Sequence, residues 1–313
     1  MLIYNIFTEK FLYLQEGYMI KYAVTVRDFS DDRERAELWM QAFRRSKLKA
    51  IELSFFPNVE PDSELTKIHG EYARKLKNEK IAEIASVHLP FMGGGKSWDM
   101  SLADEDARKD VSMRLQKIIR DNADLIPANV TMHSSMEPPL EEHPARIECV
   151  CRTIEELLPL AEEIGFSLNV EYLPRKCIGN CIAELENIIN RFDPKHVNLC
   201  MDVNHVMDKY NELPDIIAHL APRIRTFHFN DYDGIDEKHW FPGQGVINWG
   251  AVMKAVRAID HDVTVIMECT KQLEVFGRLP DPYFALRQTE AAYWYIENYN
   301  EIEQRLKEFE IKY

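Results

Sequence analysis

The 313-residue sequence has little glycine and proline and lacks any long hydrophobic run. Only 12 Gly and 15 Pro accompany 46% hydrophobic and 29% charged residues, a composition that excludes collagen-like, fibrous and largely disordered chains. No apolar stretch approaches the roughly 20 residues of a membrane-spanning helix, so no membrane partner is expected. Residues 1–18 also lack the basic start, apolar centre and small-residue cleavage site of a signal peptide.

Basic residues and metal-type cysteine pairs are scarce as well. Lys and Arg together number 38 against 52 Asp and Glu, which gives a net charge of −14. A field of that sign repels phosphate backbones, so we expect no nucleic-acid partner. The six cysteines are irregularly spaced and form no paired metal motif, which predicts reduced thiols and a cytoplasmic protein.

The chain beyond residue 18 has the pattern of one domain. A strand-like run, IKYAVTV, begins just after Met19, and no Ser/Gly-rich linker or low-complexity segment interrupts the rest of the chain. We therefore expect residues 19–313 to form a single domain. Residues 1–18 allow two interpretations: a non-native or flexible extension, or an N-terminal arm that packs on the fold.

Short β-rich runs alternate with amphipathic segments along this domain. The runs are mostly apolar rather than alternating, as in strands buried on both faces, and we place strands at residues 21–26, 50–55, 84–89, 130–133, 167–172, 197–202, 225–229 and 263–268. Between them, apolar residues recur every three or four positions, which predicts helices that include residues 32–45, 104–122, 145–164 and 249–259.

Eight such units predict a single (β/α)8 TIM barrel, a fold that typically takes about 250 residues. A doubly wound sheet is the competitor, but it usually carries a glycine-rich phosphate turn after its first strand. Here that position has the sequence Arg27-Asp28-Phe29-Ser30, without glycine, which favours the barrel. The tail, residues 285–313, is predicted to be one long helix that closes the barrel, and its aromatic side chains offer a face for a homo-oligomer.

The third to eighth strands all end in residues that can bind a metal. These residues are His88, His133, Glu171, Asp202, His228 and Glu268. In a barrel, the carboxyl ends of the strands meet at the face that carries active sites. Carboxylates gathered there would repel one another without a cation. A mixed set of imidazole and carboxylate groups suits Mn²⁺, Zn²⁺, Co²⁺ or Fe²⁺ better than Mg²⁺, so the sequence predicts a divalent ion at this face.

At these residues the sequence resembles the sugar phosphate isomerase/epimerase family of the xylose-isomerase-like TIM barrel superfamily. The match runs from Met19 to about Thr270, and its most specific stretch is HFNDYDGIDEKHWFPGQGVINWGAVMKAV at residues 228–256. This stretch is similar to the family's metal-binding His, an acidic residue three positions on, and a His before a Pro-Gly-x-Gly turn. MDVNH at residues 201–205, VEYLP and MECT are similar to further family motifs.

The resemblance implies a site for a sugar or sugar derivative. It implies that one divalent metal ion is held by Glu171, Asp202, His228 and Glu268. It also implies that His205 and His239 face the substrate and that His88 lines the pocket.

Isomerising or epimerising a sugar requires removal of a proton next to a carbonyl, from a carbon acid too weak for an unaided side chain. A divalent ion can stabilise the enediolate that forms, and two carboxylates can remove the proton and return it elsewhere. Glu171 and Glu268 lie on strands three steps apart around the ring, so we expect them to be this acid and base.

Two further residues are candidates for substrate contact. Glu52, within the second strand, is expected to orient the substrate, with a structural ion pair as the alternative. Trp98, together with Phe56, Phe91 and Trp240, is expected either to cover the apolar faces of the sugar or to cap the barrel rim.

Two other activities use a related site. The superfamily contains zinc-dependent apurinic endonucleases with three ions, whose additional histidines are similar to His88, His133, His205 and His239. The sequence departs from their Asp-x-His motif at Glu237-Lys238-His239, and its net charge disfavours a DNA duplex. An inosose-type dehydratase on the same metal site is the other alternative.

Overall fold

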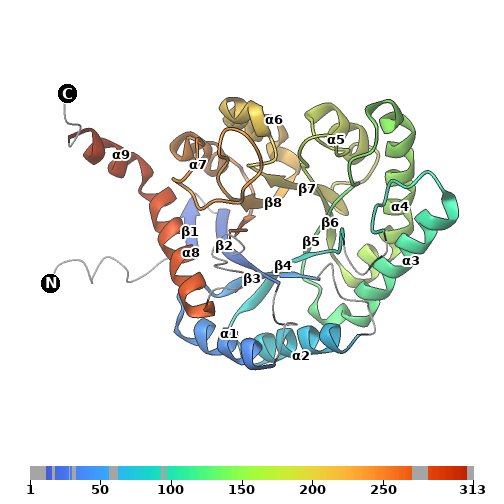
Figure 1. Ribbon diagram of the computed structural model, residues 1–313, viewed down its shortest axis with the longest axis horizontal. Helices are drawn as coiled ribbons and strands as arrows, with labels where there is room; N and C mark the ends of the chain where they lie inside the picture. The colour runs from blue at the N-terminus through green and yellow to red at the C-terminus, as the bar shows by residue number, and fades with distance from the viewer. Residues whose placement is uncertain are drawn as a thin grey trace.

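Eight parallel strands close into a barrel with helices around it (Figure 1). The computed structural model describes residues 12–15, 18–27, 29, 33–55, 63–92, 95, 97–269 and 281–308. The barrel strands are β2 (Tyr18–Val26), β3 (Ala50–Ser54), β4 (Glu83–His88), β5 (Asn129–Met132), β6 (Ser167–Glu171), β7 (Val197–Asp202), β8 (Ile224–Phe229) and β9 (Val263–Met267). Each pairs with the next, and β9 pairs in parallel with β2 to close the ring, so the predicted (β/α)8 barrel is confirmed.

The helices follow the strands in regular alternation. They are α1 (Arg33–Arg45), α2 (Glu64–Asn78), α3 (Glu105–Asp121), α4 (His143–Ile164), α5 (Ile182–Ile189), α6 (Leu213–Leu220), α7 (Trp249–Arg257), α8 (Pro282–Glu297) and α9 (Tyr299–Glu308). Polar side chains cap several first turns: Asp104 accepts a hydrogen bond from the Ala107 N–H, and Asn248 accepts one from the Ala251 N–H. Gly165 ends α4 in the left-handed conformation, with φ of 88°, which suits glycine.

Burial of the strands explains why their sequences are apolar throughout. Every residue of β3, β6, β7 and β9 is buried, because one face packs inside the barrel and the other packs against the helices. α1 shows the matching pattern on the outside, where Trp39, Met40 and Phe43 are buried and the indole stacks on the Phe43 ring. The predicted strands and helices therefore agree with the observed ones to within a few residues at their ends.

Part of the N-terminal segment forms an additional strand. β1 (Leu12–Gln15) pairs antiparallel with the start of β2, with Leu12 opposite Lys21 and Gln15 opposite Tyr18. Most of residues 1–18 lie outside the described part of the chain, so the two interpretations of this segment stay predictions.

The tail differs from the single long helix that the sequence predicts. Asn298 ends α8, its N–H bonding back to Trp294 and Tyr295 carbonyls, and α9 begins at the next residue in a new direction (Figure 1). α8 nonetheless closes the barrel seam, since the Tyr293 hydroxyl donates to the carbonyl of Val265 on β9 and contacts that of Ala23 on β2. None of the described helices is both long and apolar enough to cross a membrane.

Candidate active site and metal centre

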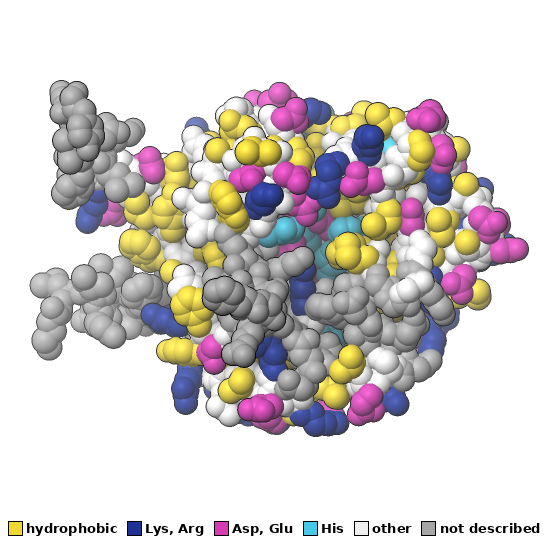
Figure 2. Space-filling model, in the orientation of Figure 1, with side chains coloured by type: hydrophobic (Ala, Val, Ile, Leu, Met, Phe, Trp, Pro, Cys, Tyr) yellow, Lys and Arg dark blue, Asp and Glu magenta, His cyan; other side chains and the backbone are white. Residues whose placement is uncertain are grey.

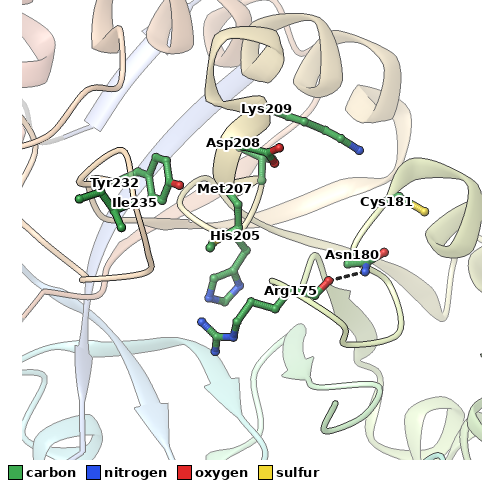
Figure 3. Close-up of a pocket in the computed structure, with 10 residues that line it drawn as sticks. Arg175, Asn180, Cys181, His205, Met207, Asp208, Lys209, Tyr232 and Ile235 are labelled. Atoms are coloured by element: carbon green, nitrogen blue, oxygen red, sulfur yellow. Dashed lines mark hydrogen bonds between the residues drawn. The ribbon is translucent and has the colours of Figure 1, made fainter. Parts of the chain in front are cut away.

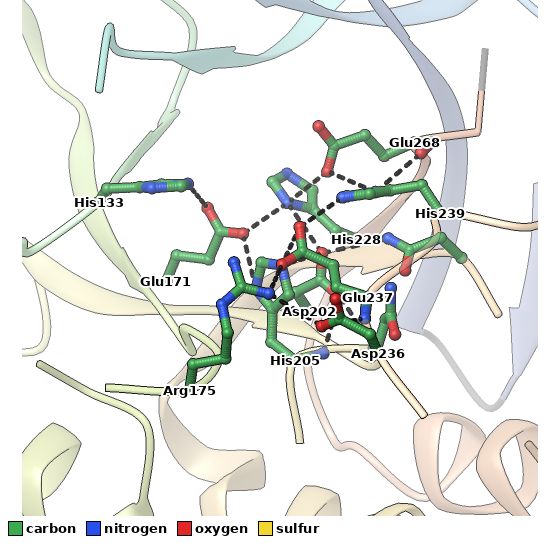
Figure 4. A network of polar contacts seen from close by, with 12 residues as sticks. His133, Glu171, Arg175, Asp202, His205, His228, Asp236, Glu237, His239 and Glu268 are labelled. Carbon is green, nitrogen blue, oxygen red and sulfur yellow. Dashed lines mark hydrogen bonds and ion pairs between the residues drawn. The ribbon is translucent and has the colours of Figure 1, made fainter. Parts of the chain in front are cut away.

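Four neighbouring strands place three of the predicted metal ligands around Nδ1 of the fourth, His228 (Figure 4). Glu171 and Asp202 are the last residues of β6 and β7, His228 lies one residue before the end of β8, and Glu268 directly follows β9. From His228 Nδ1, the nearest carboxylate oxygens lie at 3.2 Å (Glu171), 3.3 Å (Glu268) and 3.9 Å (Asp202). Ligand atoms bound at about 2.1 Å to one ion are separated by about 3.0–3.5 Å. Two of the separations fall in that range and the third lies slightly outside it.

The surroundings of His228 favour a cation beside its Nδ1. The other ring nitrogen, Nε2, lies 3.2 Å from the carboxylate of Glu52, while Nδ1 faces the three carboxylates of the other candidate ligands. A neutral imidazole has one N–H, and an ionised carboxylate only accepts hydrogen bonds. Carboxylates on both sides therefore favour either a second proton on the ring or a metal ion at Nδ1. In keeping with this, the pKa of His228 lies well above its ordinary value: burial lowers it, but the charges of Glu52, Glu171 and Glu268 raise it more. These residues fit a divalent metal ion held by His, Asp and Glu side chains.

Two more histidines contact the outer oxygen of Glu171. His88, the last residue of β4, and His133, which follows β5, place their Nε2 atoms 3.2 Å and 3.1 Å from Glu171 Oε2. His88 Nδ1 lies 2.8 Å from the backbone carbonyl of Leu89, an acceptor, so this nitrogen carries the hydrogen and Nε2 faces Glu171. His88 therefore lies beside the candidate ligands, as the sequence predicted. Its contact with a substrate stays a prediction.

A second cluster lies on the other side of Asp202. Glu237 Oε1 is 2.9 Å from His239 Nε2 and 3.5 Å from His205 Nε2. Nδ1 of His205 lies 2.8 Å from the Tyr172 carbonyl oxygen, and Nδ1 of His239 lies 3.2 Å from the Glu268 carbonyl oxygen. Because Nδ1 is occupied in both rings, both Nε2 atoms are directed at the cluster. The structure thus brings His205 and His239 beside the four ligands, where the sequence placed the substrate.

Electrostatic contacts keep the two catalytic candidates ionised. Burial would raise the pKa of Glu171, but the imidazoles of His133 and His228 lower it more, so its pKa lies well below the ordinary value. Burial also opposes ionisation of Glu268, yet the positive charges of Arg27 and His228 lower its pKa to about 2. Both carboxylates are negative at neutral pH, as a base or a metal ligand needs to be.

Three contributors to the site were not predicted. Arg27, which follows β2, forms an ion pair with Glu268, and Glu237 forms the second cluster. Arg175, in the loop after β6, lies 2.9 Å from carboxylate oxygens of both Glu237 and Glu137. Arg27 stands at the end of the first barrel strand and could have been found by extending the strand-end argument to it. The sequence around Arg175 carries no comparable signal, because loop geometry decides where its side chain lies.

Glu52 and Trp98 lie differently from the other predicted residues. Glu52 has no exposed surface and lies behind His228, on the side away from the three carboxylates. Trp98 is buried, and the guanidinium of Arg114 on α3 lies 4.2 Å from its ring centroid. Among the other aromatic candidates, Phe91 stacks on the His133 ring with centroids 3.9 Å apart, while Phe56 lies outside the described residues. Contact of Trp98 with a substrate stays a prediction.

A cavity of about 400 Å³ adjoins the second cluster (Figure 3). Its lining includes His205 together with Arg175, Asn180, Cys181, Val206, Met207, Asp208, Lys209, Tyr232 and Ile235. Figure 2 shows histidine and acidic side chains near the middle of this face. Polar groups therefore line the space next to the candidate ligands, as a site for a hydroxylated molecule requires.

Backbone strain is concentrated in the same region. Among the described residues other than glycine, four have positive φ, and three of these, Arg175, Met207 and His239, belong to the cavity or the second cluster. Their φ angles of 52°, 55° and 52° cost free energy for any residue with a Cβ atom. Such strain is most often found at functional sites, so its location supports this face as the active site.

Comparison with known proteins defines the family. Residues 40–286 match the family described as xylose isomerase-like TIM barrel. The chain therefore belongs to this family. An uncharacterised protein of Methanocaldococcus jannaschii, MJ1311, is 24% identical over 204 residues, 63% of this chain and 68% of the relative. The D-psicose 3-epimerase of Enterocloster bolteae is 25% identical over 119 residues, but these cover only 37% of this chain and 38% of the enzyme.

Solved structures share the fold over almost the whole chain. A D-tagatose 3-epimerase-like protein superposes with a TM-score of 0.69 at 20% identity, covering 90% of this chain and 99% of the other. The IolI protein, solved with a bound zinc atom, superposes with a TM-score of 0.64 at 14% identity, covering 89% and 98%. At these identities the comparison establishes the barrel alone.

Proposed function

We propose that the protein is a metal-dependent isomerase or epimerase that moves a proton on the carbon next to a carbonyl of a sugar or sugar derivative. The observation that carries this proposal is the convergence of two ionised carboxylates, Glu171 and Glu268, on His228 Nδ1 from strands three steps apart. Similarity to sugar 3-epimerases in part of the sequence and in the fold supports the substrate class.

The metal ion would be held by Glu171, Asp202, His228 and Glu268, and when bound it would polarise the carbonyl and stabilise the negative charge that develops on its oxygen. We assign Zn²⁺, Mn²⁺, Co²⁺ or Fe²⁺ to this mixed ligand set. One of the two glutamates removes the proton from carbon, and either the same or the opposite carboxylic acid returns it. Return to the same carbon from the opposite face gives an epimer, and return to the neighbouring carbon gives an isomer. His205 and His239 are positioned to hydrogen-bond substrate hydroxyls.

Solvent hydrogen exchange tests this assignment without requiring the substrate to be known in advance. The metal-loaded protein is incubated in D₂O with a panel of ketoses and keto-sugar derivatives, and NMR follows deuterium entering next to the carbonyl. Glu171→Gln and Glu268→Gln should each slow exchange by about 10²–10⁴-fold, because general base catalysis contributes that much. Glu186→Gln is the control, since Glu186 is a surface carboxylate paired with His219 on the outside of the barrel. Unchanged exchange in either site variant, or none in the wild type on any substrate, would contradict the proposal.

A second candidate is phosphodiester cleavage at abasic DNA. The observation that favours it is the pair of flanking clusters, which bring His88, His133, His205, His239 and Glu237 beside the four ligands and offer places for additional ions. The net charge of −14 argues against it. A nicking assay on an abasic duplex distinguishes this activity, while loss of water from a keto-inositol distinguishes the dehydratase alternative.

A further inference from the structure

Glu52 is buried in the barrel interior, and its carboxylate accepts hydrogen bonds from neighbouring side chains. Its exposed fraction is 0%. Thr25 on β2 donates its hydroxyl to Oε1 at 3.2 Å, and Ser86 on β4 donates its hydroxyl to Oε2 at 2.9 Å. Both partners lie directly beside Glu52 in the sheet, Thr25 in the β2–β3 register and Ser86 in the β3–β4 register. The strands themselves therefore hold the carboxylate in place.

Among the described residues, the third hydrogen-bond partner of this carboxylate is the candidate ligand His228. His228 Nε2 lies 3.2 Å from Glu52, and Nδ1 of the same ring faces Glu171, Asp202 and Glu268. In the neutral imidazole that binds a metal at Nδ1, Nε2 is the nitrogen that carries the hydrogen, and the Glu52 carboxylate accepts it. Nδ1 then presents its lone pair toward the three carboxylates, which is the form of imidazole that binds a metal.

A purely structural role explains this arrangement poorly. Burying a carboxylate is costly, and replacing a buried ion pair with apolar residues is often neutral or stabilising. The imidazole also lies between Glu52 and the three other candidate ligands, so direct contact between Glu52 and an ion or substrate among them would require the ring to move. A carboxylate that fixes the orientation and tautomer of a ligating histidine is a recurring feature of metal sites.

We propose that Glu52 is a positioning residue that holds His228 with Nδ1 directed at the ion, and that it contacts neither the ion nor the substrate. This inference rests on the metal site of the proposed function. It replaces the expectation that Glu52 orients the substrate with a role exerted through His228. It also accounts for the hydroxyls of Thr25 and Ser86 on the two neighbouring strands.

Metal affinity is the direct test. In Glu52→Gln the amide oxygen can still accept from Ser86 and His228, because both contact Oε2, but the negative charge beside the imidazole is lost. Binding of Co²⁺ and Zn²⁺, measured by competition with a chromogenic chelator, should weaken by about 10–100-fold, the usual effect of losing such a partner. The visible absorption bands of bound Co²⁺ should also change, because an imidazole without a negatively charged partner is a weaker ligand.

Glu290→Gln is the matched control. Glu290 on α8 is also a buried carboxylate, bonded to the Ser46 hydroxyl and the Lys47 N–H just before β3, at the opposite end of the barrel. It should lose thermal stability without losing metal affinity or changing the Co²⁺ bands. Should Glu52→Gln fail to fold, Ser86→Ala removes one donor to Glu52 and should produce a smaller loss of affinity in the same direction.

The outcomes separate this inference from the proposed function. Wild-type protein that binds an ion tightly, with Glu52→Gln and Ser86→Ala binding it equally well, would overturn the role of Glu52 alone. A wild type that binds no divalent ion would overturn both. Weaker binding in the two Glu52-site variants but not in Glu290→Gln would support the inference.

Discussion

The carboxylate of Asp231 is predicted to hold together the loop that carries Glu237 and His239. Its two oxygens accept four hydrogen bonds: Oδ1 from the Tyr232 and Ile247 N–H groups (3.0 and 3.2 Å), and Oδ2 from the Gly243 N–H and the Trp249 indole (2.8 and 2.9 Å). Asp231 is wholly buried, so water cannot replace these contacts.

The substitution Asp231→Asn turns one accepting oxygen into an NH₂ group. Whichever way the amide is oriented, two N–H donors lose their acceptor and face a donor instead. At about 1.5–3 kcal/mol for each hydrogen bond to a charged group, the variant should lose about 3–6 kcal/mol of the free energy of unfolding. Urea unfolding of the metal-free protein measures this without a contribution from ion binding.

Asp233→Asn is the control in the same loop. Oδ1 of Asp233 accepts from the Ile235 and Asp236 N–H groups at 2.7 Å each, so an asparagine oxygen can keep both bonds. It should cost less than about 1 kcal/mol, as is usual for a change that leaves buried donors satisfied. Equal losses in the two variants, or a loss below about 1 kcal/mol in Asp231→Asn, would refute the reasoning.

Two further predictions concern His69 and Gly245. Burial lowers the pKa of His69 to about 4, against 6.5 in the unfolded chain. As the pH falls below 6.5, the unfolded state therefore binds a proton that the folded state does not, and the free energy of unfolding decreases. Comparing urea unfolding at pH 7 and pH 5, His69→Leu should remove about 2 kcal/mol of the wild-type loss. Equal losses in wild type and His69→Leu would contradict this. In Gly245→Ala the new Cβ would lie 2.0 Å from the Tyr232 carbonyl oxygen, so the variant should be less stable by about 1–3 kcal/mol in thermal unfolding. An unchanged Tm would contradict this prediction.

The sequence was sufficient to predict the barrel because burial on both faces makes each parallel strand apolar from end to end. It also predicted that these strand-end side chains would lie together, since a residue at the carboxyl end of a barrel strand has a fixed location whatever the loops do. That four of them bind the ion is implied by the family resemblance and stays a prediction. Glu171, Asp202, His228 and Glu268 all belong to such ends.

The contacts that the sequence did not predict depend on loop conformations, which the pattern of apolar residues does not indicate. Arg175 and Glu237 meet because two long loops, each containing a residue with positive φ, fold toward each other. The charged and aromatic sequence of the tail predicts one helix, whereas the structure changes direction at Asn298. For Glu52 the sequence leaves substrate contact and a structural ion pair both open, because its strand position alone does not reveal which neighbouring side chain faces it.

The central claim is that Glu171, Asp202, His228 and Glu268 bind one divalent ion at the mouth of the barrel. The most direct measurement is equilibrium dialysis of metal-free protein against Zn²⁺, with the metal per chain counted by mass spectrometry in wild type, Asp202→Asn and His228→Ala. We predict one tightly held ion per chain in the wild type and its loss in both variants. A wild type without bound metal, or variants that retain it undiminished, would contradict the account.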